Sequence, residues 1–188
     1  MILQSLAAYY YRLLEAGKVP LLGLQRKEVH WIVEINTDGS FVSLKRVGDG
    51  KRGQRRTVPY EVNRSSNILA NLLWDNPEYV LGASISGKPG KSAKKNANFV
   101  SRLDQLPPDV KDDVGVAAVI AFYAKGNVSS VCASSSWETL CSEGGNVSFM
   151  LTGDRDLICE RPAVLDTLCK VAMEEYGLSS EPAWCLAT

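Results

Sequence analysis

Histidine is almost absent from this chain, and its cysteines form no recognisable pairs. The 188 residues include one histidine, His30, and five cysteines, none of them in a CxxC arrangement. One imidazole cannot provide a cluster of metal ligands, and an odd number of scattered cysteines fits neither a zinc knuckle nor a disulfide framework. We therefore expect no metal, no bound cofactor and a reducing, cytoplasmic environment.

Long hydrophobic runs are also missing. The longest apolar stretch, residues 114–124, is too short to cross a bilayer, and the N-terminus lacks both a cationic leader and a small-residue cleavage site. A hydrophobic content of 45% nevertheless supports an ordinary folded core. We expect a soluble globular protein with no membrane partner.

The residues for nucleophilic catalysis are poorly matched. Cys132 and the serines at 134–136 could act as nucleophiles, but nothing places His30 beside them as a base, and His30 adjoins Trp31 in an expected strand. We therefore expect a protein that is not an enzyme.

Two glycine-rich loops keep one enzymatic alternative open. Residues 48–53 spell GxGxxG, yet QRRTVPY follows, which is not the start of a helix. Residues 82–88 spell GxxxxGK, but Pro89 stands where a nucleotide-binding loop needs a hydroxyl for magnesium. The alternative function is thus a nucleotide-binding enzyme that uses the 48–53 or the 82–88 loop.

Positive charge is concentrated in one region, residues 45–102. This region has twelve cations and four acids, a net +8, whereas residues 103–188 have five cations and thirteen acids, a net −8. A basic region of this kind is typical of a protein that binds phosphates. A solvated charged surface, or a face that binds an acidic protein, are the other interpretations. The twelve cations are Lys45, Arg46, Lys51, Arg52, Arg55, Arg56, Arg64, Lys88, Lys91, Lys94, Lys95 and Arg102.

Hydrophobic periodicity predicts an α+β fold, a small antiparallel sheet with a hairpin, packed by several helices. The hairpin is expected over 29–35 and 41–47 because Thr37-Asp38-Gly39 separates two alternating runs. An extended piece at 56–60 is expected to return to the same sheet. Helices are expected over 2–16, 91–106, 108–124 and 162–176, and extended segments over 147–151, 156–159 and after 182.

The expected helix over 91–106 has two distinct faces. Its apolar face, with Phe99 and Leu103, can pack on the core. The opposite face presents Lys91, Lys94, Lys95, Asn98 and Arg102. We predict that this face and the 48–56 loop converge into one groove that binds a polyanion.

Amide side chains within the basic region are candidates for reading bases, because an amide both donates and accepts hydrogen bonds. The alternative for each is a turn or a helix cap, and for Trp74 and Tyr79 we expect a place in the core. The candidate amides are Asn67, Asn71, Asn76, Asn96 and Asn98.

Several segments together resemble one protein family. The opening MILQSLAAYYYRLLEAGKVPLLG, the stretch WIVEINTDG, the loop GDGKRGQRRTVP and above all NLLWDNPEYVLG (71–82) resemble the N-terminal part of the large subunit of the type I-C CRISPR surveillance (Cascade) complex. The resemblance covers the whole chain. It implies that residues 1–188 are an N-terminal domain, truncated C-terminally, of a longer subunit, with its nucleic-acid-facing region at about 45–102.

The resemblance implies a non-enzymatic role in antiviral defence. Such a domain recognises the protospacer-adjacent motif in duplex DNA and helps to open the strands for guide RNA pairing. Its partners are guide RNA, duplex target DNA, the other subunits of the complex and a recruited helicase–nuclease. Asn71 and Lys88, and then Asn98, are expected near the motif, and Arg52, Arg55 and Arg56 on nucleic-acid backbone. Arg64, Lys91, Lys94, Lys95 and Arg102 complete the predicted nucleic-acid-binding residues.

Overall fold

The computed structural model describes residues 23–64, 67–85 and 87–162 continuously, with single residues on either side. The strands are β1 (Leu24–Val29), β2 (Trp31–Ile35), β3 (Phe41–Arg46), β4 (Gln54–Pro59), β5 (Trp74–Asp75) and β6 (Val147–Leu151). The helices are α2 (Pro77–Val80), α3 (Pro89–Asp104), α4 (Pro108–Lys111), α5 (Val114–Ala124), α6 (Val128–Cys132), α7 (Trp137–Glu143) and the 3₁₀-helix η1 (Ile158–Glu160). The segments predicted at 2–16, 162–176 and after 182 lie wholly or mostly outside the described residues.

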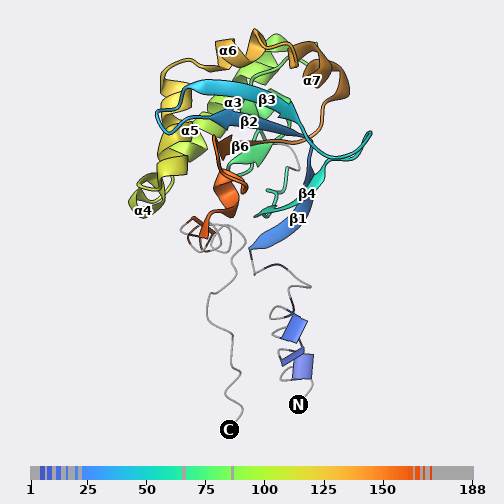
Figure 1. The fold of residues 1–188 in the computed structure, drawn as a ribbon, viewed down its shortest axis with the longest axis vertical. Coiled ribbons are helices and arrows are strands. Elements are labelled where there is room, and N and C mark those ends of the chain that lie inside the picture. Colours follow the sequence, from blue (N-terminus) through green and yellow to red (C-terminus); the bar gives the residue numbers. More distant parts are fainter. Residues whose placement is uncertain are drawn as a thin grey trace.

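A four-stranded sheet in the order β3-β2-β6-β5 forms the centre of the molecule. The predicted hairpin is confirmed as β2 and β3, and the α+β fold class is confirmed. One feature differs, since β6 pairs with β2 in parallel and makes the sheet mixed. Parallel neighbours need a long crossover, and here residues 36–146 provide it. In Figure 1, α3 and α5 lie behind this sheet, and α6 and α7 lie beside its edge strand β3.

Strands β1 and β4 form a separate two-stranded antiparallel sheet. The prediction that residues 56–60 return to the sheet of the hairpin was therefore wrong, because β1 provides their partner and no strand was expected before residue 29. We call this pair, with the loop 48–53 that leads into β4, the basic arm. It extends from the β2–β3 hairpin past the edge of the central sheet (Figure 1).

The short helices α2, α6 and α7 were not predicted, and two of the predicted segments need correction. Helix α3 is confirmed, but the helix expected over 108–124 is divided into α4 and α5. The break occurs because the Asp113 carboxylate accepts from the amides of Gly115 (2.8 Å) and Val116 (3.2 Å) and starts α5. The extended segment predicted at 156–159 was wrong, since these residues lead into the short η1. No helix among the described residues is long and apolar enough to span a membrane.

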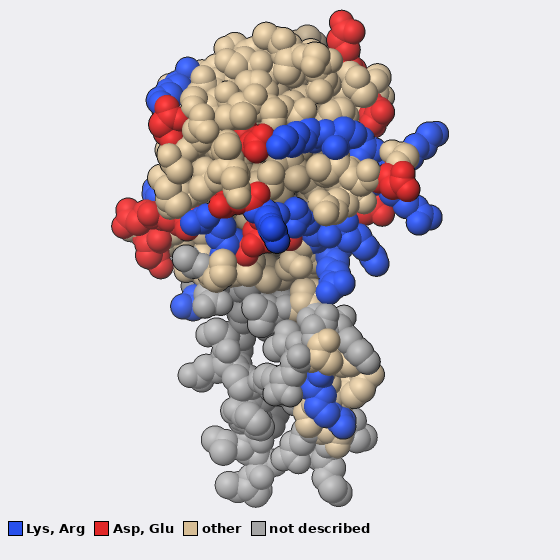
Figure 2. Space-filling view, viewed as in Figure 1, with Lys and Arg blue, Asp and Glu red and all other residues tan. Residues whose placement is uncertain are grey.

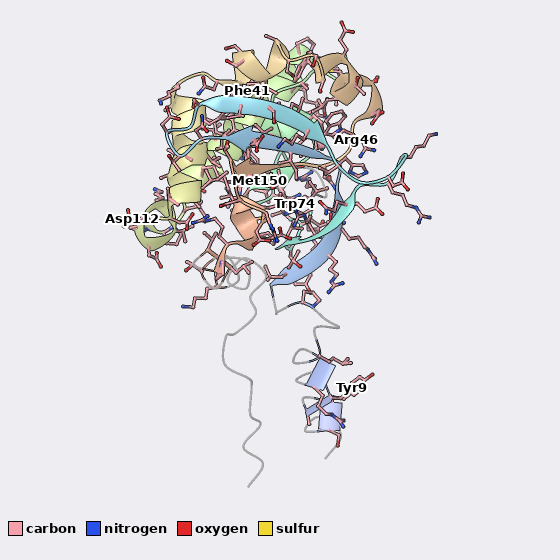
Figure 3. The ribbon with its side chains drawn as sticks, in the orientation of Figure 1. Tyr9, Phe41, Arg46, Trp74, Asp112 and Met150 are labelled. Atoms are coloured by element: carbon pink, nitrogen blue, oxygen red, sulfur yellow. The ribbon has the colours of Figure 1, made fainter. Side chains whose placement is uncertain are left out.

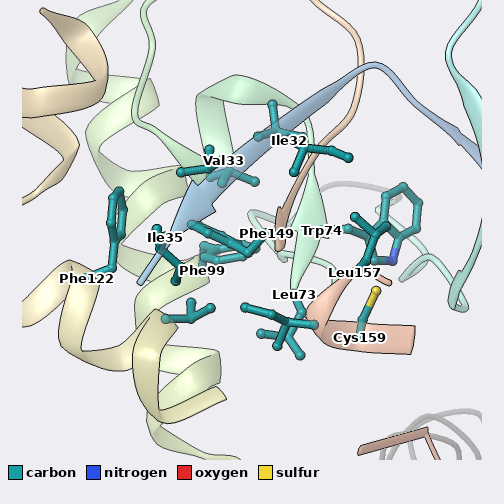
Figure 4. Close-up of a cluster of buried hydrophobic side chains, with 14 of the residues drawn as sticks. Ile32, Val33, Ile35, Leu73, Trp74, Phe99, Phe122, Phe149, Leu157 and Cys159 are labelled. Carbon is teal, nitrogen blue, oxygen red and sulfur yellow. The ribbon is translucent and has the colours of Figure 1, made fainter. Parts of the chain in front are cut away.

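The core lies between the central sheet and helices α3 and α5. Phe149 of β6 contacts Phe122 of α5 edge to face, with ring centroids 5.5 Å apart, and Phe99 of α3 is 1% exposed (Figure 4). Edge-to-face contacts place the positive rim of one ring against the negative face of the next. On the other side of the sheet, Trp74 is buried and donates its indole N–H to the carbonyl of Pro59 at 3.0 Å. The core placement predicted for Trp74 and Tyr79 is confirmed.

The hairpin turn is held tightly against α5 at Gly39. Its φ is +80°, and a Cβ at this position would lie 2.5 Å from the amide nitrogen of Phe122 and 2.8 Å from the carbonyl oxygen of Ala118. Because both atoms belong to the backbone of a helix, neither can move aside easily. Gly126 has a similar φ of +69° but open space around it.

These two glycines make a matched pair for a stability test. Gly126→Ala should lower the free energy of unfolding by about 1 kcal/mol, the cost of a left-handed conformation with a Cβ. Gly39→Ala carries the same cost plus a backbone clash, for a further loss of about 1–3 kcal/mol. Urea unfolding monitored by tryptophan fluorescence measures both, and equal losses would contradict the close approach of the turn to α5.

Candidate nucleic-acid interface

The basic arm owes its direction to a junction at His30, the only residue between β1 and β2. The amides of His30 and Trp31 both donate to the carbonyl of Asn146, at 2.8 and 3.0 Å. The side-chain amide of Asn146 donates to the carbonyl of Glu28 at 2.8 Å. The backbone amide of Asn146 donates to Nδ1 of His30 at 3.1 Å. Asn146 therefore fastens the arm to the start of β6.

His30 is held in its neutral form by this arrangement. Burial lowers the pKa of its imidazole, and the positive charge of Arg46 lowers it further, while Glu28 and Glu143 act in the opposite sense. A neutral ring is required for Nδ1 to accept the Asn146 amide. The structural role expected for His30 is confirmed by this hydrogen bond.

Arg46 supports the base of the 48–53 loop. Its guanidinium bonds the carboxylate of Glu143 at 2.8 Å and the carbonyl of Gly50 at 2.8 Å, and it lies over the ring of Trp31 at 5.7 Å. Figure 3 shows Arg46 where the arm leaves the central sheet. Although Arg46 is one of the twelve cations of the basic region, its donors are committed to the protein itself.

A second fastening holds β4 through the carboxylate of Glu160. This carboxylate accepts from the Arg56 guanidinium at 3.1 Å, the Thr57 amide at 3.0 Å and the Leu157 amide at 2.9 Å. Arg56 also donates to the carbonyl of Arg155 at 3.0 Å. Glu160 thus occupies part of the outer edge of β4, and Arg56 stabilises the arm from within. The prediction that Arg56 contacts a nucleic-acid backbone gains no support from this position.

Lys27 of β1 is half-buried and pairs with Glu61 at 2.9 Å, and the other cations of the arm, apart from Arg56, are exposed. Lys51 and Arg52 are exposed in the loop, and Arg55 is exposed on β4, as is Arg26 on β1. In Figure 2, basic side chains cover the region of the arm on the face shown. The arm therefore has the exposed positive charge that a phosphate-binding surface requires.

Helix α3 presents a smaller cationic surface than its sequence indicated. Lys88, Lys91 and Lys94 are exposed near its start. Lys95, in contrast, pairs with the carboxylate of Glu78, and Arg102 is 7% exposed. The cationic face predicted over 91–102 is thus divided, since only its first turns point to solvent.

Arg64 also belongs to the framework. Its guanidinium pairs with the carboxylate of Asp75, donates to the carbonyl of Leu69 at 2.6 Å and lies 4.3 Å from the centre of the Tyr79 ring. Asp75 itself is 2% exposed and accepts the amides of Asn71 (2.8 Å) and Asn76 (2.7 Å). Burial raises the pKa of Asp75, and these hydrogen bonds oppose the increase. This carboxylate organises the 71–76 segment.

The amides proposed as base readers mostly have partners within the protein. Asn71 is 4% exposed, and its side-chain oxygen accepts the Val62 amide at 2.9 Å. Asn98 accepts the Ala70 amide at 2.7 Å, Asn96 donates to the Tyr79 and Val80 carbonyls, and Asn76 caps α2. In this structure these four side chains secure loops, and only Asn67 of the five candidates is exposed.

The two basic segments do not share a groove. The arm loop projects beyond the edge of the central sheet, whereas α3 packs on α2 and α5 behind that sheet (Figure 1). The predicted convergence of 48–56 with 91–102 was therefore wrong, because it assumed neighbouring elements on one face. The molecule has two separate basic surfaces: the arm, and the start of α3.

The structure adds contributors that sequence reasoning missed. Arg26 and Lys27 lie on β1 beside the basic strand β4, and Glu160 comes from the 3₁₀-helix η1, about 100 residues further along the chain. Residues 1–44 are balanced in charge, so counting by segment hid the first two. The sequence contained one signal of this pairing: QRKEV (25–29) and QRRTVP (54–59) both combine charged and β-branched residues, as paired strands often do.

The geometry gives no support to a nucleophilic enzyme. Burial raises the pKa of the Cys132, Cys141 and Cys159 thiols, that of Cys159 to about 12, so these thiols stay protonated near neutral pH. Within the described ranges, no group of three or more histidine, cysteine, aspartate or glutamate residues could hold a metal ion.

The glycine-rich loops lack the surroundings of phosphate-binding loops. The 48–53 loop leads into strand β4 and not into a helix. The 82–88 loop precedes α3 but follows helix α2, where a nucleotide-binding loop follows a strand.

The Glu160 fastening can be tested by a neutral substitution. Glu160→Gln removes the charge opposite Arg56 within a largely buried contact, and we expect a loss of about 2 kcal/mol in the free energy of unfolding. Glu61→Gln, which removes the charge of an exposed pair with Lys27, should cost less than about 1 kcal/mol. Chemical denaturation of both variants provides the comparison. Equal losses would contradict the role of Glu160 at the arm.

The junction predicts a pH dependence with a definite sign. Because folding lowers the pKa of His30 below its ordinary 6.5, the unfolded chain binds more protons between the two values. The stability from this site is complete above pH 6.5 and is lost as the pH falls through the folded pKa.

As the chain has one histidine, its NMR signal reports this titration without overlap. His30→Asn places an oxygen acceptor near Nδ1 without a titrating group, so the difference in stability between pH 7.5 and 5 should shrink. A histidine that titrates above pH 6.5 would contradict the neutral ring.

Comparison with known proteins identifies one family. The family model Cas_Csd1, described as a CRISPR-associated protein, matches residues 6–188. No curated protein matches the chain. The matched range includes both basic surfaces and the 71–82 segment.

Proposed function

The chain belongs to the Cas_Csd1 family of CRISPR-associated proteins, the large subunit of the type I-C Cascade complex, and we propose that it binds duplex target DNA through its basic arm. It recognises the region of the protospacer-adjacent motif there and aids strand opening for guide RNA pairing. Membership of the family implies other Cas proteins and guide RNA as partners. We further propose a non-catalytic role, with cutting left to a recruited helicase–nuclease.

The observation that carries this proposal is the charge of the arm. Residues 24–29 and 48–59 contain six cations (Arg26, Lys27, Lys51, Arg52, Arg55, Arg56) and two acids (Glu28, Asp49), a net charge of +4. Arg56 and Lys27 pair with Glu160 and Glu61, and the other four cations are exposed. Two independent fastenings, at Asn146 and at Glu160, hold this charge in one orientation. Positively charged groups that are already oriented bind a polyanion with a smaller loss of conformational freedom.

The start of α3 provides a second contact. Lys88, Lys91 and Lys94 are exposed on it. Twenty base pairs of B-form target DNA are about 68 Å long at 3.4 Å per pair, longer than a domain of this size. Separate basic surfaces can therefore engage separate stretches of the same nucleic acid.

Strand opening is supported by one apolar side chain. Ile85 is 40% exposed in the loop that precedes Lys88 and α3. Proteins that unstack base steps often insert an apolar wedge beside phosphate-binding cations. We propose that Ile85 acts as such a wedge.

A nucleotide-binding function is the second candidate, and one cavity favours it. Gly50 and Lys51 of the 48–53 loop line a cavity of about 720 Å³ together with His30, Arg46 and residues 142–145. This volume is within the range of small-molecule sites. However, Arg46 is neutralised by Glu143, which leaves Lys51 as the main charge for a phosphate. Saturable micromolar binding of ATP and magnesium in a calorimeter would establish this function.

The salt dependence of DNA binding tests the proposed function. Removing the two exposed loop cations in Lys51→Ala/Arg52→Ala should weaken duplex binding and lower the slope of log K against log salt by about 1.8, or 0.9 for each phosphate contact. Fluorescence anisotropy between 50 and 200 mM salt measures both quantities. Lys125→Ala is the control, since Lys125 is an exposed lysine paired with Asp38 on the hairpin turn. An unchanged slope in the double variant would contradict a role for the arm.

A further inference from the structure

The basic arm has the shape of a reading element as well as a charge. Strands β1 and β4 pair over six residues each, from Leu24↔Pro59 to Val29↔Gln54, and form a ribbon of two strands only. Six residues span about 20 Å, and the strands of a ribbon lie about 5 Å apart. Such a ribbon is about as long as six base pairs of B-form DNA.

The two faces of the ribbon differ. One face contains Val29, Val58 and Arg56, which are buried or bonded to Glu160, and it anchors the arm to the protein. The other face presents Arg26 and Arg55, both exposed, with the half-buried Thr57 and Glu28 opposite them. Its far end, formed by Leu24 and Pro59, is buried, so the open part of this face lies toward the 48–53 loop. In the register of the two strands, Arg26 lies opposite Thr57, and Arg55 lies opposite Glu28. The two arginines are therefore diagonal neighbours, about 7–8 Å apart in a regular antiparallel pair.

The dimensions of the ribbon select one kind of groove. The major groove of B-form DNA is about 12 Å wide and admits a two-stranded ribbon, whereas the minor groove is about 6 Å wide and admits strands where the duplex is bent or widened at an energetic cost. The major groove of A-form RNA is too deep and narrow for side chains to read. The ribbon therefore fits the major groove of undistorted B-form DNA better than it fits the minor groove or an RNA helix.

We propose that the β1–β4 ribbon enters the major groove of duplex DNA with the open, loop-side part of this face, and that Arg26 and Arg55 are directed at base edges. This inference rests on the proposed DNA-binding function and specifies its groove. Lys51 and Arg52, at the end of the ribbon, contact phosphates on the groove wall and position it. Arg55, expected from the sequence to contact backbone, is thereby assigned to the edge of a guanine, which an arginine can bind through two hydrogen bonds.

Groove-specific probes test this assignment on the chain and on the assembled Cascade complex that contains it. Duplexes of one sequence are prepared with cytosine or with glucosylated hydroxymethylcytosine, whose sugar fills the major groove, and unmodified duplex is also tested with netropsin bound in the minor groove. Glucosylation should weaken binding about tenfold or more, and netropsin should change it less than twofold. A double-stranded RNA of the same sequence should bind more weakly than DNA.

Matched variants identify the side chain. Arg55→Ala should weaken binding to unmodified duplex about tenfold and abolish the effect of glucosylation at the bases it contacts, since a bidentate contact contributes about 1–3 kcal/mol. Gln54→Ala is the control, because Gln54 is the exposed neighbour on the opposite face of the same strand. Circular dichroism confirms that both variants fold.

The outcomes separate the inference from the function on which it rests. Inhibition by netropsin alone, with no effect of glucosylation, would overturn the ribbon assignment and leave DNA binding intact. The same holds if Arg55→Ala and Gln54→Ala bind DNA equally well. Failure of the complex to bind either duplex would overturn the proposed function as well.

Discussion

The hydrogen bonds of Asn146 decide where the arm points. Its carbonyl accepts two consecutive amides, those of His30 and Trp31, and its side chain reaches the carbonyl of Glu28. Because the amides of His30 and Trp31 donate to the same carbonyl, the chain turns at His30. Residues 24–35 are thereby divided into β1 of the arm and β2 of the central sheet. Without this node, β1 and β4 would extend the hairpin in its own plane, and their arginines would face another direction.

The segment that most strongly identifies the family is mainly a structural element. In NLLWDN, Asp75 is buried and collects the amides of Asn71 and Asn76 together with the guanidinium of Arg64. Leu73 has a φ of +60°, a conformation that few residues with a side chain adopt. A loop with this geometry needs its polar side chains to satisfy buried backbone groups, and this explains why its amides are not available to a ligand.

Local patterns in the sequence were sufficient for the local elements. The Asp-Gly turn predicted the β2–β3 hairpin, and the apolar periodicity ending at Pro107 predicted α3. Long-range pairing could not be inferred in the same way. Residues 24–29 share with residues 54–59 a mixture of charged and β-branched residues, but this similarity fixes neither the partner nor the register, and the parallel alignment of β6 with β2 depends on how the crossover packs.

The candidate site also depends on contacts between distant residues that the sequence does not reveal. Composition located a basic region, yet it could not separate cations that face solvent, such as Lys51 and Lys91, from those that a carboxylate neutralises. Lys95 and Arg56 became internal because Glu78 and Glu160 reach them from other elements. An ion pair of this kind depends on three-dimensional neighbours, and charge counting along the chain does not register it.

The parallel pairing of β2 with β6 also affects synthesis. His30 and Asn146 are 116 residues apart, so at about 5–20 residues per second the ribosome needs on the order of ten seconds to deliver the partner of β2. During this interval the nascent hairpin has an open hydrogen-bonding edge beside apolar residues, a surface prone to pair with other chains. This edge therefore stays open to pairing with other chains until residue 151 has emerged from the ribosome.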